Sequence, residues 1–306
     1  MSLTTIRVTV GRIVLVAGIL ILLFIPYLLW GTGLITAHNQ SVLTQQFREA
    51  QKKSNSHPAT SIAAPAHDAT PPAPKVAPTT AAPPVGTAVG TIQIPKIDLS
   101  MTVVEGTDEA QLAMGPGHYP TTPLPGEAGN AAIAGHRTTY LHPFYSLDAL
   151  SSGDLIYVTT LQGTFLYSVT KSQVVLPTDV AVVAPTPTPQ LTLTTCNPRY
   201  SASQRLVVSA NLVASELAHP TGTPVDEVKH HHTAPSANTT TAASKDWLPA
   251  ILWGVLVAAL ATGVWMVALR TRRGRRALTI VVGLVVWLIV VFFFFQAVTP
   301  LLPASY

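Results

Sequence analysis

Three long runs of apolar residues interrupt the otherwise mixed pattern of polar and apolar positions along the chain. None of them holds a charged side chain, and each exceeds the roughly 20 residues that a membrane-spanning helix needs. They cover residues 13–36, 247–269 and 277–302. The composition agrees, since 48% of the 306 residues are hydrophobic and only 10% are charged. The pattern therefore predicts three transmembrane helices.

Two clusters of arginine set the expected orientation of these helices. The clusters are Arg7 with Arg12, and the stretch "RTRRGRR" at residues 270–276. Basic loops tend to stay in the cytoplasm, so residues 1–12 and 270–276 are expected inside, and residues 37–246 and 303–306 outside. These clusters explain most of the net charge of +4, so we expect no nucleic-acid partner.

A cleaved signal peptide is the alternative interpretation of the first apolar run. The apolar part of such a peptide is usually only about 7–15 residues long, and this run is longer. We therefore expect an uncleaved anchor.

The part outside the membrane divides by composition into two tethers and one folded domain. Residues 37–89 are rich in proline, alanine and threonine, and residues 217–246 form a second stretch of low complexity. Such segments bury too little apolar surface to offset the entropy of ordering. We expect a stalk over 37–89, a linker over 217–246 and a globular domain over 90–216.

Short strand-like segments fill the expected globular domain. "VGTIQIPKI", "NAAIAGH", "QLTLTTC" and "QRLVVSANLV" predict strands, and a further segment predicts a hairpin about Gln162 and Gly163. "TDEAQLAMG" predicts a short helix with Thr107 as its N-cap, and "HPFYSLDAL" a helical turn. Many short strands with few helices predict an all-β fold, either a closed barrel or a sandwich.

The only cysteine of the chain, Cys196, ends one of these strands. A single cysteine excludes an intramolecular disulfide, which leaves a spare thiol, a dimer contact or a nucleophile. A nucleophilic thiol needs a nearby cation, which His136 can supply before it passes a proton to a leaving amine. Arg205 can stabilise an oxyanion or hold a substrate carbonyl. If the two strands pair as antiparallel neighbours, Cys196 and Arg205 fall at the same rim.

The chemistry alone leaves structural roles open for all three residues. Cys196 can be a small buried hydrophobe, Arg205 a solvated strand residue, and His136 a partner of a loop. Two other histidines, His118 and His142, have similar surroundings. The three consecutive histidines at residues 230–232 could bind a metal, but they lie in the expected linker, which has no fixed geometry. We therefore expect no metal site and no cofactor.

The motifs in combination resemble the sortases, the membrane-anchored cysteine transpeptidases of Gram-positive bacteria. "TLTTC" at residues 192–196, "GHR" at 135–137 and the following Arg205 carry the resemblance, which covers about residues 88–215. It implies an eight-stranded β-barrel with short helices. It also implies Cys196 as nucleophile, His136 as general acid and base, and Arg205 as the stabiliser of substrate or oxyanion. The sequence around these motifs is most similar to that of the class E sortases of actinobacteria.

The resemblance also implies a reaction. Sortases cleave a sorting signal such as Leu-Pro-x-Thr-Gly, or Leu-Ala-x-Thr-Gly in class E, between Thr and Gly through a thioacyl enzyme. An amine of a cell-wall precursor, or a pilin lysine, then releases the product. The implied partners are surface proteins with a sorting signal, that amine and the plasma membrane, with the catalytic domain on the extracytoplasmic face. The alternatives are a pilin-polymerising sortase, a thiol hydrolase of cell-wall peptides and a non-enzymatic surface module.

Overall fold

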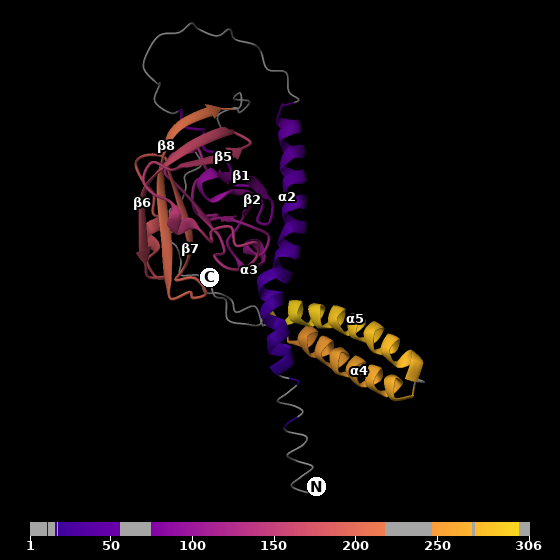
Figure 1. Ribbon diagram of the computed structural model, residues 1–306. Coiled ribbons are helices and arrows are strands. Elements are labelled where there is room, and N and C mark those ends of the chain that lie inside the picture. Colours follow the sequence, from indigo (N-terminus) through magenta and orange to yellow (C-terminus); the bar gives the residue numbers. More distant parts are fainter. Residues whose placement is uncertain are drawn as a thin grey trace. The chain divides into compact units, whose positions relative to one another are not determined.

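The chain forms two compact units in the computed structural model (Figure 1). One unit comprises Met1–Gly31 with Pro235–Ala304, and the other Thr32–Ala234 with Ser305–Tyr306. The structure describes residues 11, 16, 18–55, 75–217, 247–270 and 273–299. Each unit is considered by itself.

Eight strands among the described residues close a β-barrel in the second unit (Figure 1). Around the barrel their order is β1-β2-β3-β4-β7-β8-β6-β5, and β5 pairs with β1 to close it. Only β2 with β3 and β4 with β7 run parallel. The strands are β1 (Ala88–Ile94), β2 (Leu99–Glu105), β3 (Gly117–His118), β4 (Asn130–Ala134), β5 (Leu155–Thr160), β6 (Gly163–Val175), β7 (Gln190–Asn197) and β8 (Gln204–Leu217). This confirms the expected barrel and excludes the sandwich.

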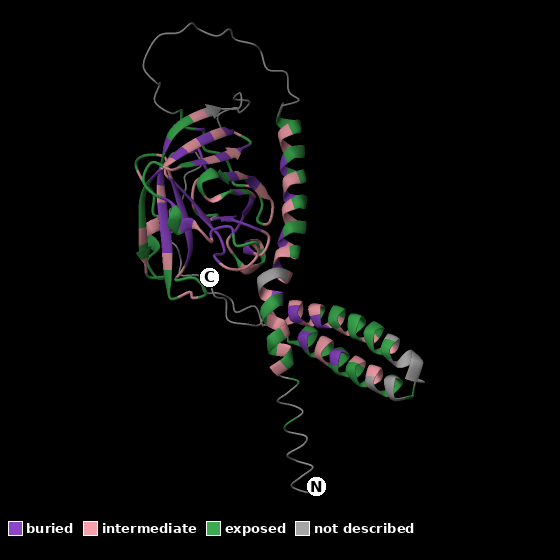
Figure 2. Cartoon of the chain, in the orientation of Figure 1, coloured by how far each residue is buried: buried purple, intermediate pink, exposed green. Residues whose placement is uncertain are grey.

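Alternating side chains of the strands fill the interior of the barrel. Leu191 and Leu193 of β7 and Val208 of β8 belong to one core cluster and are fully buried. Figure 2 shows buried stretches in purple on the barrel strands, beside intermediate ones in pink. Each such side chain contributes about 1.5–3 kcal/mol when it is removed from water. Successive strand residues point to opposite faces, so Thr194 and Cys196 lie on the outer face of the barrel. The apolar pattern of β7 thus places the thiol outside the core.

Short helices occupy the connections of the barrel. They are η2 (Pro95–Ile97), α3 (Glu109–Leu112), η3 (Leu147–Ala149) and η4 (Val180–Val183). The expected short helix is α3, but its N-cap is Asp108 and not Thr107, and no side-chain hydrogen bond caps it. The expected hairpin is confirmed, because Thr160 pairs with Gly163 across the turn between β5 and β6.

Helix α2 (Thr32–Asn55) corrects two expected boundaries. The sequence predicted a transmembrane helix up to residue 36 and a stalk from residue 37. Instead α2 lies along the barrel, and its Leu43 and Phe47 are 0% and 3% exposed (Figure 1). Their spacing of four residues gives the helix one apolar stripe, which the barrel covers.

The later part of the expected stalk also contacts the barrel. The Ala77 amide donates a hydrogen bond of 2.8 Å to the Gly126 carbonyl, and Ala77 is buried. A stalk is therefore the wrong interpretation of residues 37–55 and 75–89. Residues 56–74, and nearly all of the expected linker at 217–246, lie outside the described residues.

The first unit contains η1 (Tyr27–Gly31), α4 (Leu248–Arg270) and α5 (Arg273–Val298). The Tyr27 ring packs against the rings of Phe292 and Phe295, with centroids 5.4 Å apart in both pairs. The Trp287 indole donates a hydrogen bond of 3.2 Å to the Val257 carbonyl, which joins α5 to α4.

Within the described residues, one helix is long and apolar enough to cross a membrane, where the sequence predicted three. It is the stretch Thr279–Val298 of α5, with a mean hydropathy of 2.8. The apolar stretch of α4, Leu248–Val264, is shorter. The first expected span is described only in part, and its last residues belong to α2. The expected arginine-rich loop is also shorter, because α5 begins at Arg273.

Candidate functional site

Three strand ends meet at one edge of the barrel and bring the candidate residues together. Strands β4 and β7 run parallel, so their carboxyl ends lie at the same edge; Cys196 is in β7, and His136 follows β4. Strand β8 runs antiparallel to β7, and Arg205 stands directly opposite Cys196. Residues opposed in this way present their side chains to the same face of a sheet. His136, Cys196 and Arg205 line one cavity of about 280 Å³.

The rest of the cavity wall is largely apolar. The outer face of the sheet supplies Ala134, Thr194 and Val207, and other residues come from the end of β6, from the segment between β6 and β7 and from α3. These others include Val175, Leu176, Val180, Val182, Val183 and Leu112. An apolar hollow with a few convergent polar groups is typical of a ligand site.

Asn130 fixes the segment that carries η4 over the sheet. Its side-chain amide donates hydrogen bonds of 3.1 Å to the carbonyls of Val182 and Ala184. Its carbonyl oxygen accepts a bond of 2.7 Å from the Thr192 hydroxyl. The three valines of η4 in the cavity wall are therefore held in place by β4, the strand that leads to His136.

Cys196 is buried, with 9% of the residue's surface exposed. Burial raises the pKa of this thiol, because a thiolate loses its hydration there, while the charges of Arg205 and Arg137 act in the opposite direction. Burial has the larger effect, so the thiol keeps its proton at neutral pH.

His136 is held in a similar environment, with 7% of its surface exposed. Burial lowers the pKa of its imidazole to about 4. Its ring lies against the ring of Tyr140, with centroids 4.8 Å apart, and its carbonyl accepts a bond of 3.1 Å from the Phe144 amide. Gly135 must be a glycine, since a Cβ there would lie 2.6 Å from the Phe144 ring. The imidazole is therefore neutral at neutral pH and ready to accept a proton.

Arg205 supplies the cation beside this neutral pair. Its Nη1 donates hydrogen bonds of 3.0 Å and 3.1 Å to the carbonyls of Ala202 and Gln204, which fixes the guanidinium at the start of β8. A guanidinium has five N–H groups, so it can also bind a ligand oxygen in the cavity.

The rival histidines lie in other environments. His118 is fully buried, and its Nδ1 and Nε2 lie 2.8 Å from Glu105 Oε2 and 2.9 Å from the Pro123 carbonyl. His142 is exposed and lies beside the ring of Tyr145. Neither lines the cavity. The histidine run at residues 230–232 lies outside the described residues.

Arg137 is a site residue that the sequence pattern did not single out. It is 4% exposed, and its Nη1 donates hydrogen bonds of 3.1 Å to the Cys196 carbonyl and 2.7 Å to Asn197 Oδ1. Its Nη2 lies 3.0 Å from Asp148 Oδ2. Arg137 thus supports the backbone of Cys196. In the sequence, its position directly after His136 was the only indication that it belongs to the site.

Comparison with known proteins identifies this architecture. The family model described as the sortase domain matches residues 92–213. The putative sortase YwpE of Bacillus subtilis is 32% identical over 28% of this chain and 86% of its own length. The chain belongs to the sortase family.

Two longer relatives refine this assignment. Sortase SrtE1 of Streptomyces coelicolor is 31% identical over 67% of this chain and 56% of its own length. Sortase D of Bacillus subtilis is 35% identical over 38% of this chain and 58% of its own length. The likeness to SrtE1, over 223 residues, makes the chain a class E-like sortase. The matches span little more than half the length of these two relatives.

Proposed function

We propose that this sortase is a transpeptidase that cleaves a C-terminal sorting signal between Thr and Gly. The signal would be of the Leu-Pro-x-Thr-Gly type or, as in class E, of the Leu-Ala-x-Thr-Gly type. The convergence of Cys196, His136 and Arg205 on one cavity carries the proposal. A thiol, an imidazole and a guanidinium are the groups that acyl transfer through a thioester requires.

In the first half-reaction, Cys196 Sγ attacks the carbonyl carbon of the Thr residue as its proton passes to His136. Arg205 stabilises the negative charge on the carbonyl oxygen. The C–N bond then breaks, and the imidazolium of His136 gives its proton to the leaving Gly amine. A thioester on Cys196 remains.

In the second half-reaction, an amine of a cell-wall precursor attacks this thioester. His136 accepts the proton of the attacking amine, and the proton returns to the Cys196 sulfur as the C–S bond breaks. The surface protein is then joined to the precursor by an amide bond. The apolar wall around the thiol limits access by water, which would otherwise hydrolyse the thioester.

We place the barrel on the extracytoplasmic face of the plasma membrane. Sortases are membrane-associated, and α5 contains a helix long and apolar enough to span a bilayer. Arg7 and Arg12 before the first apolar run, and the arginines between α4 and α5, favour a cytoplasmic location for both segments. The barrel between them would then lie outside, with the first apolar run and α4 crossing the membrane as well as α5.

The proposal is tested with a fluorogenic sorting-signal peptide and an added amine, using the full chain in detergent. We expect ligation that depends on the amine, and a covalent adduct of the chain detected by mass spectrometry. Cys196→Ala should abolish both, because the thioester then cannot form. Cleavage that ignores the amine would instead indicate a thiol hydrolase, and ligation by Cys196→Ala would contradict the mechanism.

A peptide library separates the finer possibilities. Comparing Pro with Ala at the second position of the signal identifies the preferred signal class. Comparing a cell-wall amine with a pilin lysine peptide distinguishes surface anchoring from pilus assembly.

A further inference from the structure

Polar side chains recur at every fourth position along one face of α2. They are Thr32, Thr36, Gln40 and Thr44. Residues four apart lie above one another on a helix, and each of these four side chains contacts a residue of the barrel domain. The contacts reach three different places, and two of them adjoin the cavity.

The middle of this stripe holds the α3 wall of the cavity. The Thr36 hydroxyl donates a hydrogen bond of 2.9 Å to the Ala113 carbonyl, and Gln40 Nε2 donates one of 2.9 Å to the Met114 carbonyl. Ala113 and Met114 directly follow Leu112, the last residue of α3, which lines the cavity. The position of that wall therefore depends on α2.

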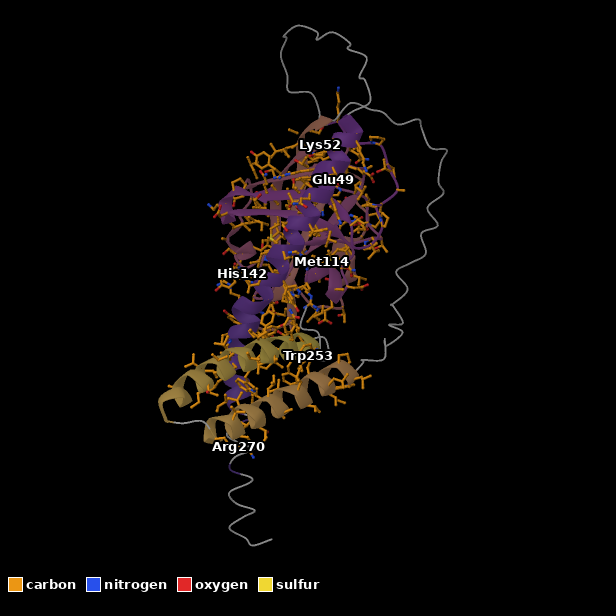
Figure 3. The ribbon with its side chains drawn as sticks, turned by 90° about the vertical axis from the view of Figure 1, so that its right-hand side faces the viewer. Glu49, Lys52, Met114, His142, Trp253 and Arg270 are labelled. Atoms are coloured by element: carbon orange, nitrogen blue, oxygen red, sulfur yellow. The ribbon has the colours of Figure 1, made fainter. Side chains whose placement is uncertain are left out.

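The start of the stripe holds the turn beside His136. The Tyr140 amide donates a hydrogen bond of 3.3 Å to the Thr32 hydroxyl, and the Tyr140 ring lies against the His136 ring. Figure 3 shows Met114 and His142, the labelled ends of the two contacted segments, on either side of α2.

The turn itself has an unfavourable backbone. Tyr140, Leu141 and His142 have φ angles of 53°, 60° and 38°, a left-handed region that non-glycine residues seldom occupy. Such conformations persist only where the surrounding structure holds them in place. Thr32 provides one such contact, and Gly33 leaves room for Leu141, whose Cδ2 would lie 3.2 Å from a Cβ at that position.

We propose that α2 is a positioning element of the active site. Thr36 and Gln40 fix the α3 wall against which the substrate packs, and Thr32 fixes the turn that keeps Tyr140 against His136. None of these side chains touches the reacting atoms. The inference rests on the proposed function, and it extends the catalytic unit of this sortase to α2, the helix that begins within the first apolar run.

Thr44 provides a matched control on the same helix. Its hydroxyl is 2.8 Å from the hydroxyl of Thr102 on β2, and neither residue lines the cavity. Thr32→Val, Thr36→Val and Thr44→Val each replace one hydroxyl by a methyl group with little change of shape. If α2 only stabilised the fold, all three variants would have the same consequences.

The test measures kcat, KM and the melting temperature of these three variants in the full chain. We expect Thr36→Val to raise KM about 2- to 10-fold with kcat nearly unchanged, the effect of losing one hydrogen bond that positions a wall. Thr32→Val should lower kcat by a similar factor, and Thr44→Val should change only the melting temperature. Equal catalytic effects in all three variants, or lower melting temperatures with unchanged catalysis, would overturn the inference.

A second measurement does not depend on turnover. Cys196 is the only cysteine, so its rate of alkylation by iodoacetamide reports how well the wall covers it. Thr36→Val and Gln40→Met should react several-fold faster than the native chain, and Thr44→Val at the native rate. If the native chain does not process the peptide, the proposed function fails, but the alkylation rates still test whether α2 positions the cavity wall. Equal alkylation rates in all four proteins would refute that positioning role.

Discussion

Two buried histidines of the barrel, His118 and His136, differ in what surrounds their rings. Both lie at strand ends, and they are 0% and 7% exposed. Both ring nitrogens of His118 lie within hydrogen-bond distance of partners, the buried Glu105 and the partly buried Pro123, so its ring is fixed inside the fold. The His136 ring faces a cavity that it shares with a thiol and a guanidinium. Burial is therefore similar in the two histidines, and what distinguishes them is that only His136 lines the cavity.

The largest effect that tests this comparison is expected from His136→Gln. Without the imidazole, Cys196 loses the proposed base that accepts its proton and the proposed acid that protonates the leaving amine. We expect kcat/KM to fall by about 10²- to 10⁴-fold, with the melting temperature at neutral pH nearly unchanged. Peptide turnover together with thermal unfolding measures both quantities, and a loss of less than tenfold would remove His136 from the mechanism.

Arg205→Lys should have the next largest effect. A lysine keeps the charge but loses the planar fork of the guanidinium, so the oxyanion is held less well. Loss of one such donor reduces kcat by about 10²- to 10³-fold in other enzymes. Arg199→Lys is the matched control, because the Arg199 side chain binds Asp148 on the surface and does not line the cavity. Near-native rates for Arg205→Lys would argue against an oxyanion role.

Acid should destabilise the fold through His136. The pKa of this residue is about 4 in the folded chain, against an ordinary value of 6.5, so between these values the unfolded chain binds a proton that the folded chain does not. Stability is therefore lost as the pH falls through this window, by about 3 kcal/mol when the pKa is 6.5 in the unfolded chain and about 4 in the folded chain. Denaturant unfolding at several pH values measures the loss, and His136→Gln should show a correspondingly weaker pH dependence. An unaltered dependence would contradict a buried neutral imidazole.

The smallest effect on catalysis is expected from His118→Gln, which should lower stability instead. The substitution disturbs the bonds to Glu105 and Pro123, and leaving such buried groups unsatisfied costs about 1–3 kcal/mol of folding free energy. We expect a lower melting temperature but a kcat within twofold of the native value, since His118 does not reach the cavity. A large loss of kcat without loss of stability would show that His118 takes part in catalysis, and would contradict its purely structural role.

The candidate site was predictable from sequence to an uneven extent. The pairing of Cys196 with Arg205 followed from two strands joined by a short loop, and the register confirms it. The choice of His136 over His118 came from the family resemblance, because their local sequences do not distinguish them. Arg137 was overlooked, since its role depends on carbonyl and amide oxygens of Cys196 and Asn197, some sixty positions away in the chain.

The helix before the barrel was the main error of the sequence interpretation. Thr32, Thr36, Gln40 and Thr44 already form a stripe in the sequence, but the preceding apolar run obscured its start. Where a lipid-facing helix ends and a protein-facing helix begins depends on the surface that covers it. That surface belongs to β1, β2 and the residues after α3, which are distant in sequence.

The sequence by itself determined the barrel strands, the outward position of Cys196 and the family, because strand alternation and short motifs are local properties. Tertiary structure alone decided the burial that keeps the Cys196 thiol and the His136 imidazole neutral, and the packing of α2 beside the site. These features depend on burial and on contacts between distant segments. No local pattern encodes them, since desolvation is set by everything that surrounds a group.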